Sequence, residues 1–259
     1  MKKDKISFHM ESDIQQRIAI GSLALGLNLT QDNIEKFIIY LKMINSYQNR
    51  INITSITEPY DIISKHFLDS LSSLKLINQE LLNYDQGKRI KIIDVGSGAG
   101  FPGLPLKIVL PKVSMVLLEA RGNRVMFLND VVDSLELKDT KIIKDRAENI
   151  GKMAEYREKF HIVLSRAVAP LAVLCEYCLP LCKVKGAMIA FKGSSYYQEL
   201  SSNNKVIEKL GGLLESVNMI KIPYSNHVRY IIVIRKINST PENYPRKNGI
   251  PQKRPLYFE

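Results

Sequence analysis

Tryptophan is absent from this chain of 259 residues, and cysteine and histidine are scarce, at three and four residues. The cysteines all lie between Cys175 and Cys182, so they do not form a disulfide framework, and a reducing cytoplasm is expected. No apolar run approaches the ~18 residues needed to span a bilayer. The charged first residues are not followed by an apolar stretch, so a secretory signal is not expected either.

Acidic residues are few relative to basic ones: 26 Asp and Glu stand against 37 Lys and Arg, a formal net charge of +11. Lys and Arg supply the salt-dependent part of nucleic-acid affinity, so this excess favours a polyanionic partner. The alternative is that the excess reflects only compositional drift in a chain rich in Lys, Ile and Asn. Hydrophobic content of 45% and charged content of 24% are ordinary for a globular protein, and the length allows one large α/β domain with appendages.

The first third of the chain, residues 1–87, is expected to form a helical cap. Residues 1–30 are weakly patterned. Thr30 is a candidate N-cap for a helix over 31–47, where apolar residues recur on one helical stripe. After a polar break, a second amphipathic helix is expected over about 60–82.

Residues 88–236 alternate between strand and helix patterns. The expected strands cover about 90–95, 113–119, 141–144, 160–165, 187–191, 213–222 and 228–236. The expected helices are a short one that stops at Pro111 and longer ones over 123–136, 170–183 and 195–210. Repeated βα units predict a mostly parallel seven-stranded sheet covered on both faces, with an antiparallel last pair and with ligands bound at the carboxyl ends of the strands.

The tail, residues 237–259, has a different composition, with four prolines and two basic pairs. Prolines at this density oppose helices and central strands. Two interpretations remain open for this segment. It is either an extended arm that lies along RNA phosphates or a solvated, disordered appendage.

The glycine-rich stretch Asp94-Val-Gly-Ser-Gly-Ala-Gly-Phe-Pro-Gly103 directly follows an apolar strand. Glycine lacks a Cβ, so the backbone N–H groups of Gly96, Gly98 and Gly100 can approach a ligand closely. A carboxylate at the strand tip suits a cationic ligand, so the pattern favours S-adenosylmethionine. The stretch also fits a dinucleotide-binding motif. In that motif the first glycine closely follows the strand, whereas Gly98 lies further along the chain, and Asp94 would repel a pyrophosphate. A tight turn without a ligand is the remaining alternative.

Other polar residues follow the later strands. Glu119 lies 23 residues after Gly96, the range for a carboxylate that binds ribose hydroxyls. Glu148, after the third strand, is expected near the edge of an adenine ring, with an ordinary solvated charge as the alternative. Arg166 and Lys192 end the fourth and fifth strands, and they are expected to position an anionic substrate or a methionine carboxylate.

Several catalytic patterns are missing. The fourth strand is not followed by the Pro-Pro-aromatic step typical of exocyclic-amine methyltransferases. Cys175, Cys178 and Cys182 share one face of an expected apolar helix, so they are interpreted as core residues and not as a nucleophile or a metal site. The scattered histidines are interpreted as structural. No catalytic base is assigned, and no metal is expected.

Eight motifs carry a family resemblance: Ile51-Asn-Ile-Thr54-Ser-Ile-Thr, His66-Phe-Leu-Asp69-Ser70-Leu, Asp94 to Gly103, Leu117-Leu-Glu119, Arg124 with Phe127-Leu128, Ala147-Glu148, Ser165-Arg166-Ala167 and Phe191-Lys192-Gly193. In this order and spacing they make the chain similar to the RsmG (GidB) family of bacterial ribosomal RNA methyltransferases, over roughly residues 25–236. The resemblance implies a Rossmann-like class I methyltransferase fold and a cytoplasmic enzyme that acts on the small ribosomal subunit or its assembly intermediate.

The resemblance further implies methyl transfer from S-adenosylmethionine to N7 of a guanine in the decoding region of 16S rRNA. By that similarity the cofactor contacts are Gly96, Phe101, Ala147, Glu148 and Arg166, to which the residue patterns add Asp94, Gly98, Gly100 and Glu119. The chain departs from the family at Glu119, where Asp is common, and at Asn123, where Lys is common. Three alternatives stay open: a methyltransferase with another target, a non-catalytic RNA-binding assembly factor, and a dehydrogenase.

Overall fold

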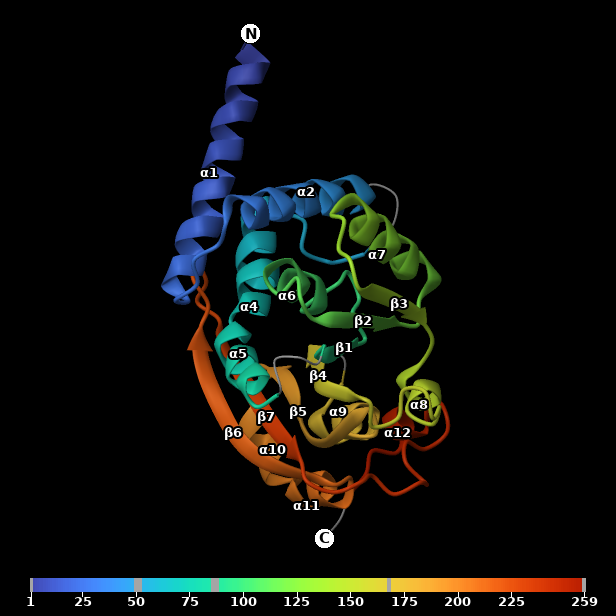
Figure 1. Cartoon of the computed structure of the whole chain (residues 1–259). Helices are drawn as coiled ribbons and strands as arrows, with labels where there is room; N and C mark the ends of the chain where they lie inside the picture. The colour runs from blue at the N-terminus through green and yellow to red at the C-terminus, as the bar shows by residue number, and fades with distance from the viewer. Residues whose placement is uncertain (1, 49–52, 85–88, 167–168, 258–259) are drawn as a thin grey trace.

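The computed structural model describes residues 2–48, 53–84, 89–166 and 169–257, and its centre is one seven-stranded sheet (Figure 1). The strands are β1 (Lys91–Val95), β2 (Ser114–Glu119), β3 (Thr140–Lys144), β4 (Phe160–Arg166), β5 (Cys182–Lys192), β6 (Gly212–Lys221) and β7 (Val228–Lys236). Their order is β3-β2-β1-β4-β5-β7-β6. β1 to β5 pair in parallel, and β7 runs antiparallel to both neighbours. The predicted mostly parallel Rossmann-like sheet is confirmed.

Helices cover both faces of the sheet (Figure 1). One face carries α1 (Lys2–Ala24), α2 (Gln31–Gln48), α3 (Pro59–Ile62), the π-helix η1 (Ile63–Leu68), α4 (Asp69–Leu71), α5 (Leu74–Leu82), α6 (Gly103–Val109) and α7 (Gly122–Ser134). The other carries α8 (Ala147–Ile150), α9 (Leu171–Cys178), α10 (Tyr196–Ser201), α11 (Asn204–Lys209) and α12 (Ile250–Lys253). Successive strand residues alternate between the two cores, as Ile92 and Ile93 do, which explains why the central strands β1, β2 and β4 are mainly apolar. Among the described helices, none has the length and apolar character to cross a membrane.

The helical cap is confirmed with one addition. Thr30 caps α2 as predicted, because its Oγ1 accepts the N–H of Asn33 at 3.2 Å while Asn33 Oδ1 accepts the N–H of Thr30 at 3.3 Å. The weakly patterned N-terminal residues form the helix α1, for which the sequence predicted helical structure but no bounds. Its buried apolar stripe is narrow, with Ile14 and Ile18 one turn apart, so the periodic signal is weak.

The single helix predicted over 60–82 is wrong in detail, because it is interrupted twice. Residues Ile63–Leu68 form a π-helix, and a turn separates α4 from α5. At that turn Ser72 Oγ donates to the carbonyl of Asp69 at 2.6 Å and Ser73 Oγ donates to that of Ser70 at 3.1 Å. Such side-chain bonds to the backbone compete with a regular helix.

Two later helices are also shorter than predicted. α9 ends at Cys178, and Cys182 begins β5 instead of continuing the helix. The three cysteines are nevertheless buried and free, and burial raises the pKa of the Cys175 thiol to about 12, so their assignment to the core is confirmed. The helix expected over 195–210 is divided into α10 and α11.

The tail packs against the domain, so its interpretation as a disordered appendage is wrong, whereas a contact with RNA phosphates stays a prediction. Tyr244 and Pro251 are buried, and the tail ends in the short helix α12 (Figure 1). Proline is tolerated there because Pro251 occupies the first turn, where its missing N–H has no partner to lose. The domain limits at 87/88 and 236/237 stay predictions, and the first falls outside the described residues.

Candidate functional site

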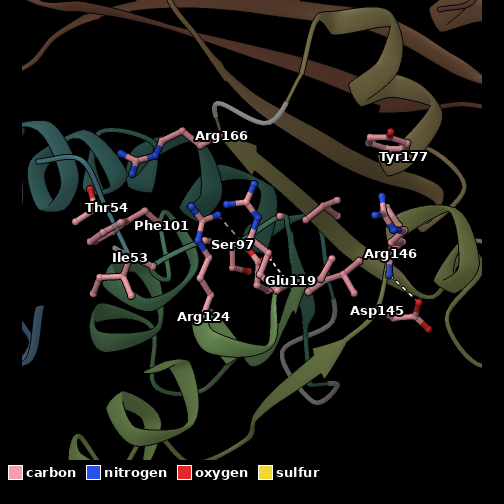
Figure 2. A pocket seen from close by; sticks show the side chains of 18 of the residues that line it. Ile53, Thr54, Ser97, Phe101, Glu119, Arg124, Asp145, Arg146, Arg166 and Tyr177 are labelled. Atoms are coloured by element: carbon pink, nitrogen blue, oxygen red, sulfur yellow. Dashed lines mark hydrogen bonds and ion pairs between the residues drawn. The ribbon is translucent and has the colours of Figure 1, made fainter. Parts of the chain in front are cut away.

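A cavity of about 580 Å³ opens at the carboxyl ends of β1 to β4, within the range of small-molecule sites (Figure 2). Seven of the predicted site residues line it: Gly96, Gly98, Phe101, Glu119, Ala147, Glu148 and Arg166. Asp94, Gly100 and Lys192 are not among the lining residues. Figure 2 shows Thr54, Phe101 and Arg166 at one end of the cavity, Glu119, Ser97 and Arg124 near its middle, and Asp145, Arg146 and Tyr177 at the other end.

The glycine turn after β1 needs glycine because three of its residues have left-handed backbone. The φ angles of Gly96, Gly98 and Gly100 are 74°, 61° and 95°. A Cβ on Gly98 would meet nothing closer than 3.7 Å, so this side of the turn is open toward the cavity. A Cβ on Gly100 would instead collide with Leu104 and lie 2.6 Å from the hydroxyl of Tyr40. Gly98 therefore faces the ligand space, whereas Gly100 faces the core.

Asp94 stabilises the turn from behind. Its Oδ2 accepts the N–H of Gly103 at 3.0 Å, and the whole residue is buried. Burial is the main reason that the pKa of this carboxyl rises to about 7, and the bond from Gly103 lowers it by less. Its Oδ1 is buried without a hydrogen-bond partner. The geometry assigns Asp94 to shaping the turn, and the sequence expectation of direct ligand contact finds no support in its position.

Glu119 holds the turn from the cavity side. Its Oε2 accepts the N–H of Gly98 at 2.9 Å and its Oε1 accepts the N–H of Arg121 at 2.8 Å. Arg124 Nη1 lies 3.7 Å from the same carboxylate. Although the Glu119 side chain is only 6% exposed, it reaches the cavity wall. The departure from the family pattern at Asn123 has no consequence for the cavity, because Asn123 is exposed and does not line it.

At one end of the cavity, Arg166 joins the sheet to the cap. Its Nη1 donates to Asp69 Oδ2 at 2.7 Å and to the carbonyl of Lys65 at 3.1 Å, and its Nη2 donates to His66 Nδ1 at 3.1 Å. The guanidinium also lies over the ring of Phe101, 5.1 Å from its centroid. These contacts orient the side chain before any ligand binds.

His66 lies beside this arginine and stays neutral. Its ring stacks on Phe101 with centroids 4.3 Å apart, and its Nε2 is hydrogen-bonded to Thr54 Oγ1 at 2.8 Å. Burial, with a smaller effect from Arg166, lowers the pKa of His66 to about 3. Of the resemblance motifs, Ile51, Asn52 and Ala167 lie outside the described residues.

The opposite end of the cavity is built by the residues after β3 and by the tail. Glu148 is buried, and its Oε1 accepts the N–H of Gly249 at 2.9 Å. Burial and the neighbouring Glu148 raise the pKa of the Tyr177 hydroxyl to about 12. Gln252, on α12, also lines the cavity. Sequence reasoning missed Tyr177 and Gln252, and no motif pointed to either.

Lys192 does not line the cavity, and its predicted role in positioning the substrate stays a prediction. Its Nζ lies 2.6 Å from Glu199 Oε2 and donates to the carbonyl of Ala169 at 3.1 Å. The other cations at the cavity are Arg121, Arg124 and Arg146. Of these, only Arg124 belonged to a motif noted in the sequence. No group of three or more His, Cys, Asp or Glu side chains that could hold a metal ion occurs in the described part of the chain.

The sequence and the structure were compared with known proteins. The profile of the family described as rRNA small subunit methyltransferase G matches residues 33–228. Ribosomal RNA small subunit methyltransferase G of Acetivibrio thermocellus is 42% identical over 246 residues, which cover 95% of this chain and 98% of that protein. The protein of the same name from Bacillus subtilis is 40% identical and covers 91% of this chain and 96% of its own length.

Among solved structures, the crystal structure of WbdD superposes with a TM-score of 0.53 at 14% identity, over 77% of this chain and 48% of that one. This likeness supports the fold alone. The family profile and the relatives of about 40% identity span most of the chain and include the glycine turn, Glu119 and Arg166. The chain belongs to the rRNA small subunit methyltransferase G family.

Proposed function

We propose that this protein transfers a methyl group from S-adenosylmethionine to N7 of a guanine in the decoding region of 16S rRNA, acting in the cytoplasm on the small ribosomal subunit or its assembly intermediate. The observation that carries the proposal is the left-handed glycine turn, open toward a cavity at the strand ends, in a chain of this family. The names of the relatives give ribosomal RNA of the small subunit as their substrate.

The cavity fits S-adenosylmethionine in both size and chemistry. The open side of Gly98 leaves room for a ligand against the turn. Glu119 offers carboxylate oxygens to the ribose hydroxyls at the middle of the cavity, and Ala147 and Glu148 adjoin the adenine. The methionine end then lies toward Arg166, whose guanidinium suits a carboxylate. Asp94 and Gly100 contribute by shaping the turn.

A second cavity, of about 280 Å³, receives the target nucleotide in this proposal. Arg166 and His66 line both cavities, so the two adjoin at these residues. Ile56 and Ile222 give the second cavity apolar walls, and Arg229 adds a cation. Apolar walls suit a purine ring, and a guanidinium suits the phosphate attached to it. For the transfer, N7 of a base bound there must reach the methyl group directly at this junction, with no side chain between them.

The reaction requires little acid–base catalysis from the protein. S-adenosylmethionine supplies an electrophilic methyl group on a cationic sulfur. Guanine N7 has a free lone pair and no proton to lose, so a general base is not required. His66 is neutral, so it adds no positive charge beside a cationic donor. The protein's main contribution is orientation of the two reactants, which supplies ~7–11 kcal/mol in well-aligned systems.

The direct test is methyl transfer from isotope-labelled S-adenosylmethionine to small ribosomal subunits that lack the modification, followed by mass spectrometry of the nucleosides. Labelled 7-methylguanosine is the expected product, and an isolated 16S rRNA substrate measured in parallel distinguishes RNA from the assembled subunit. Labelled product on a different nucleoside would refute the N7 assignment. A protein that binds the cofactor and modifies nothing in either substrate would overturn the proposed reaction.

A further inference from the structure

The C-terminal segment, defined here as residues 237–257, lies beyond the family profile, which ends at residue 228. It nevertheless returns along the domain to the cofactor cavity, where Gln252 of α12 forms part of the wall (Figure 1). Gln252 is exposed, so its amide is accessible to a ligand. The segment therefore contributes to a site whose other lining residues all precede Gln252 by 75 positions or more, with Tyr177 the last of them.

Two arginines fix the C-terminal segment to the domain. Arg246 donates from its backbone N–H, Nε and Nη2 to the carboxylate of Glu176, at distances from 2.7 to 3.1 Å, and Glu176 is fully buried. Arg157 donates to the carbonyls of Thr240, Pro241 and Tyr244 in the segment, at 2.7, 3.2 and 2.8 Å. Because these charge-assisted hydrogen bonds are several and strong, they hold the C-terminal segment in one fixed position on the domain.

The C-terminal segment also touches a predicted cofactor residue. The N–H of Gly249 donates to Glu148 Oε1 at 2.9 Å, and Glu148 is only 4% exposed. Gly249 has a φ of 76°, in the left-handed region that favours glycine, and it immediately precedes α12. One bond thus fixes the orientation of Glu148 and the start of the helix that carries Gln252.

We propose that the C-terminal segment completes the adenine end of the cofactor site: Gln252 hydrogen-bonds the adenine edge, and Gly249 orients Glu148. The inference rests on the proposed function for the identity of the cofactor. A glutamine amide has both a donor and an acceptor, which match the 6-amino group of adenine and a neighbouring ring nitrogen. Because α12 reaches the site only when the segment is docked, cofactor binding and docking stabilise each other.

The first experiment measures the affinities of S-adenosylhomocysteine and of its analogue that lacks the 6-amino group, by calorimetry. The wild-type protein is expected to prefer the amino compound by about 3- to 10-fold, the value of one hydrogen bond. Gln252→Ala is expected to lose this preference, whereas Lys253→Ala, the next residue on α12, retains it. A merely structural role for Gln252 would weaken both ligands equally and leave the ratio unchanged.

The second experiment follows tryptic cleavage after Lys247, within the C-terminal segment. Saturating S-adenosylhomocysteine is expected to slow this cleavage in the wild-type protein at least 10-fold, since a ligand at 100 times its dissociation constant favours the docked form by up to ~100-fold. Gln252→Ala should show less protection at equal ligand saturation. Equal cleavage rates with and without ligand would overturn the linkage.

The outcomes separate this inference from the proposed function. A wild-type protein that fails to bind S-adenosylhomocysteine overturns the proposed function. A wild-type protein that binds it, together with a Gln252→Ala variant whose preference for the 6-amino group is intact, overturns only the role of the C-terminal segment.

Discussion

Arg166 Nη1 donates to Asp69 Oδ2 at 2.7 Å, so the last residue of β4 is bound to the helical cap. Arg229, in β7, binds the same carboxylate through Nε at 2.7 Å and Nη2 at 2.9 Å. Asp69 is 1% exposed, and two guanidinium groups therefore depend on one buried anion. Because Arg166 lines both cavities, the cap sets the geometry between the two proposed binding sites.

Replacement of Asp69 by alanine is expected to destabilise the protein by about 3–5 kcal/mol, because it leaves two guanidinium groups without their buried partner. Urea denaturation measures this loss. Asp61→Ala is the matched control: it removes an exposed i,i+4 partner of Lys65, which typically contributes about 0.3–0.5 kcal/mol. Equal losses for the two variants would contradict the buried-anion role.

The glycine turn gives a second prediction, in which two alanine substitutions separate binding from folding. Both positions have left-handed backbone, so each variant loses about 1–2 kcal/mol from strain. Gly100→Ala also collides with Leu104 and should lose a further 1–3 kcal/mol, roughly, from overpacking. Gly98→Ala projects into the cavity and should weaken S-adenosylhomocysteine binding more than it lowers stability. Thermal denaturation measures the stability of the two variants, and calorimetry measures their affinity for S-adenosylhomocysteine. If Gly100→Ala weakened binding more and Gly98→Ala lowered stability more, the assignment of the two faces would be refuted.

Much of the fold could be predicted because the strands obey simple rules. Parallel strands buried on both faces are short apolar runs, and their boundaries fell within one residue of the predicted ones, except that β5 begins five residues earlier. The glycine turn was predictable for the same local reason, since Gly96 and Gly98 need a backbone that other residues avoid. Glu119 and Arg166 are the last residues of β2 and β4, and topology alone brings them to the same edge.

What the sequence did not predict depends on contacts between distant residues. Asp94 and Lys192 occupy strand tips like the others, but their side chains turn to Gly103 and Glu199 and away from the cavity. Gln252 lies in a proline-rich tail, and long-range contacts such as the pair of Arg246 with the buried Glu176 bring it to the site. Periodicity contains no information on such long-range polar contacts.

The buried carboxyl of Asp94 predicts a pH dependence of stability. Burial raises its pKa from 3.8 to about 7 in the native protein. Between these values the native state holds a proton that the unfolded state has lost, so this group's contribution lowers the free energy of unfolding as pH rises from about 4 to about 7. Asp94→Asn keeps an acceptor for Gly103 and removes the charge. The melting temperature of the cofactor-free variant, relative to wild type, should therefore rise between pH 5 and pH 8; a constant difference would contradict the raised pKa.

The C-terminal segment provides the last prediction. Arg246→Ala leaves the fully buried carboxylate of Glu176 without its guanidinium, and breaking a buried pair of this kind costs about 3–5 kcal/mol. Part of this cost disappears if the C-terminal segment undocks and water reaches Glu176, so the variant should combine lower stability with faster tryptic cleavage after Lys247.

The control variant Arg254→Ala removes an exposed charge of the same type from the C-terminal segment, and it should change neither stability nor cleavage. The double variant Arg246→Ala with Glu176→Gln removes the uncompensated charge, and it should recover stability without recovering resistance to cleavage. If Arg246→Ala leaves both stability and cleavage at wild-type values, the tail is not held by this pair.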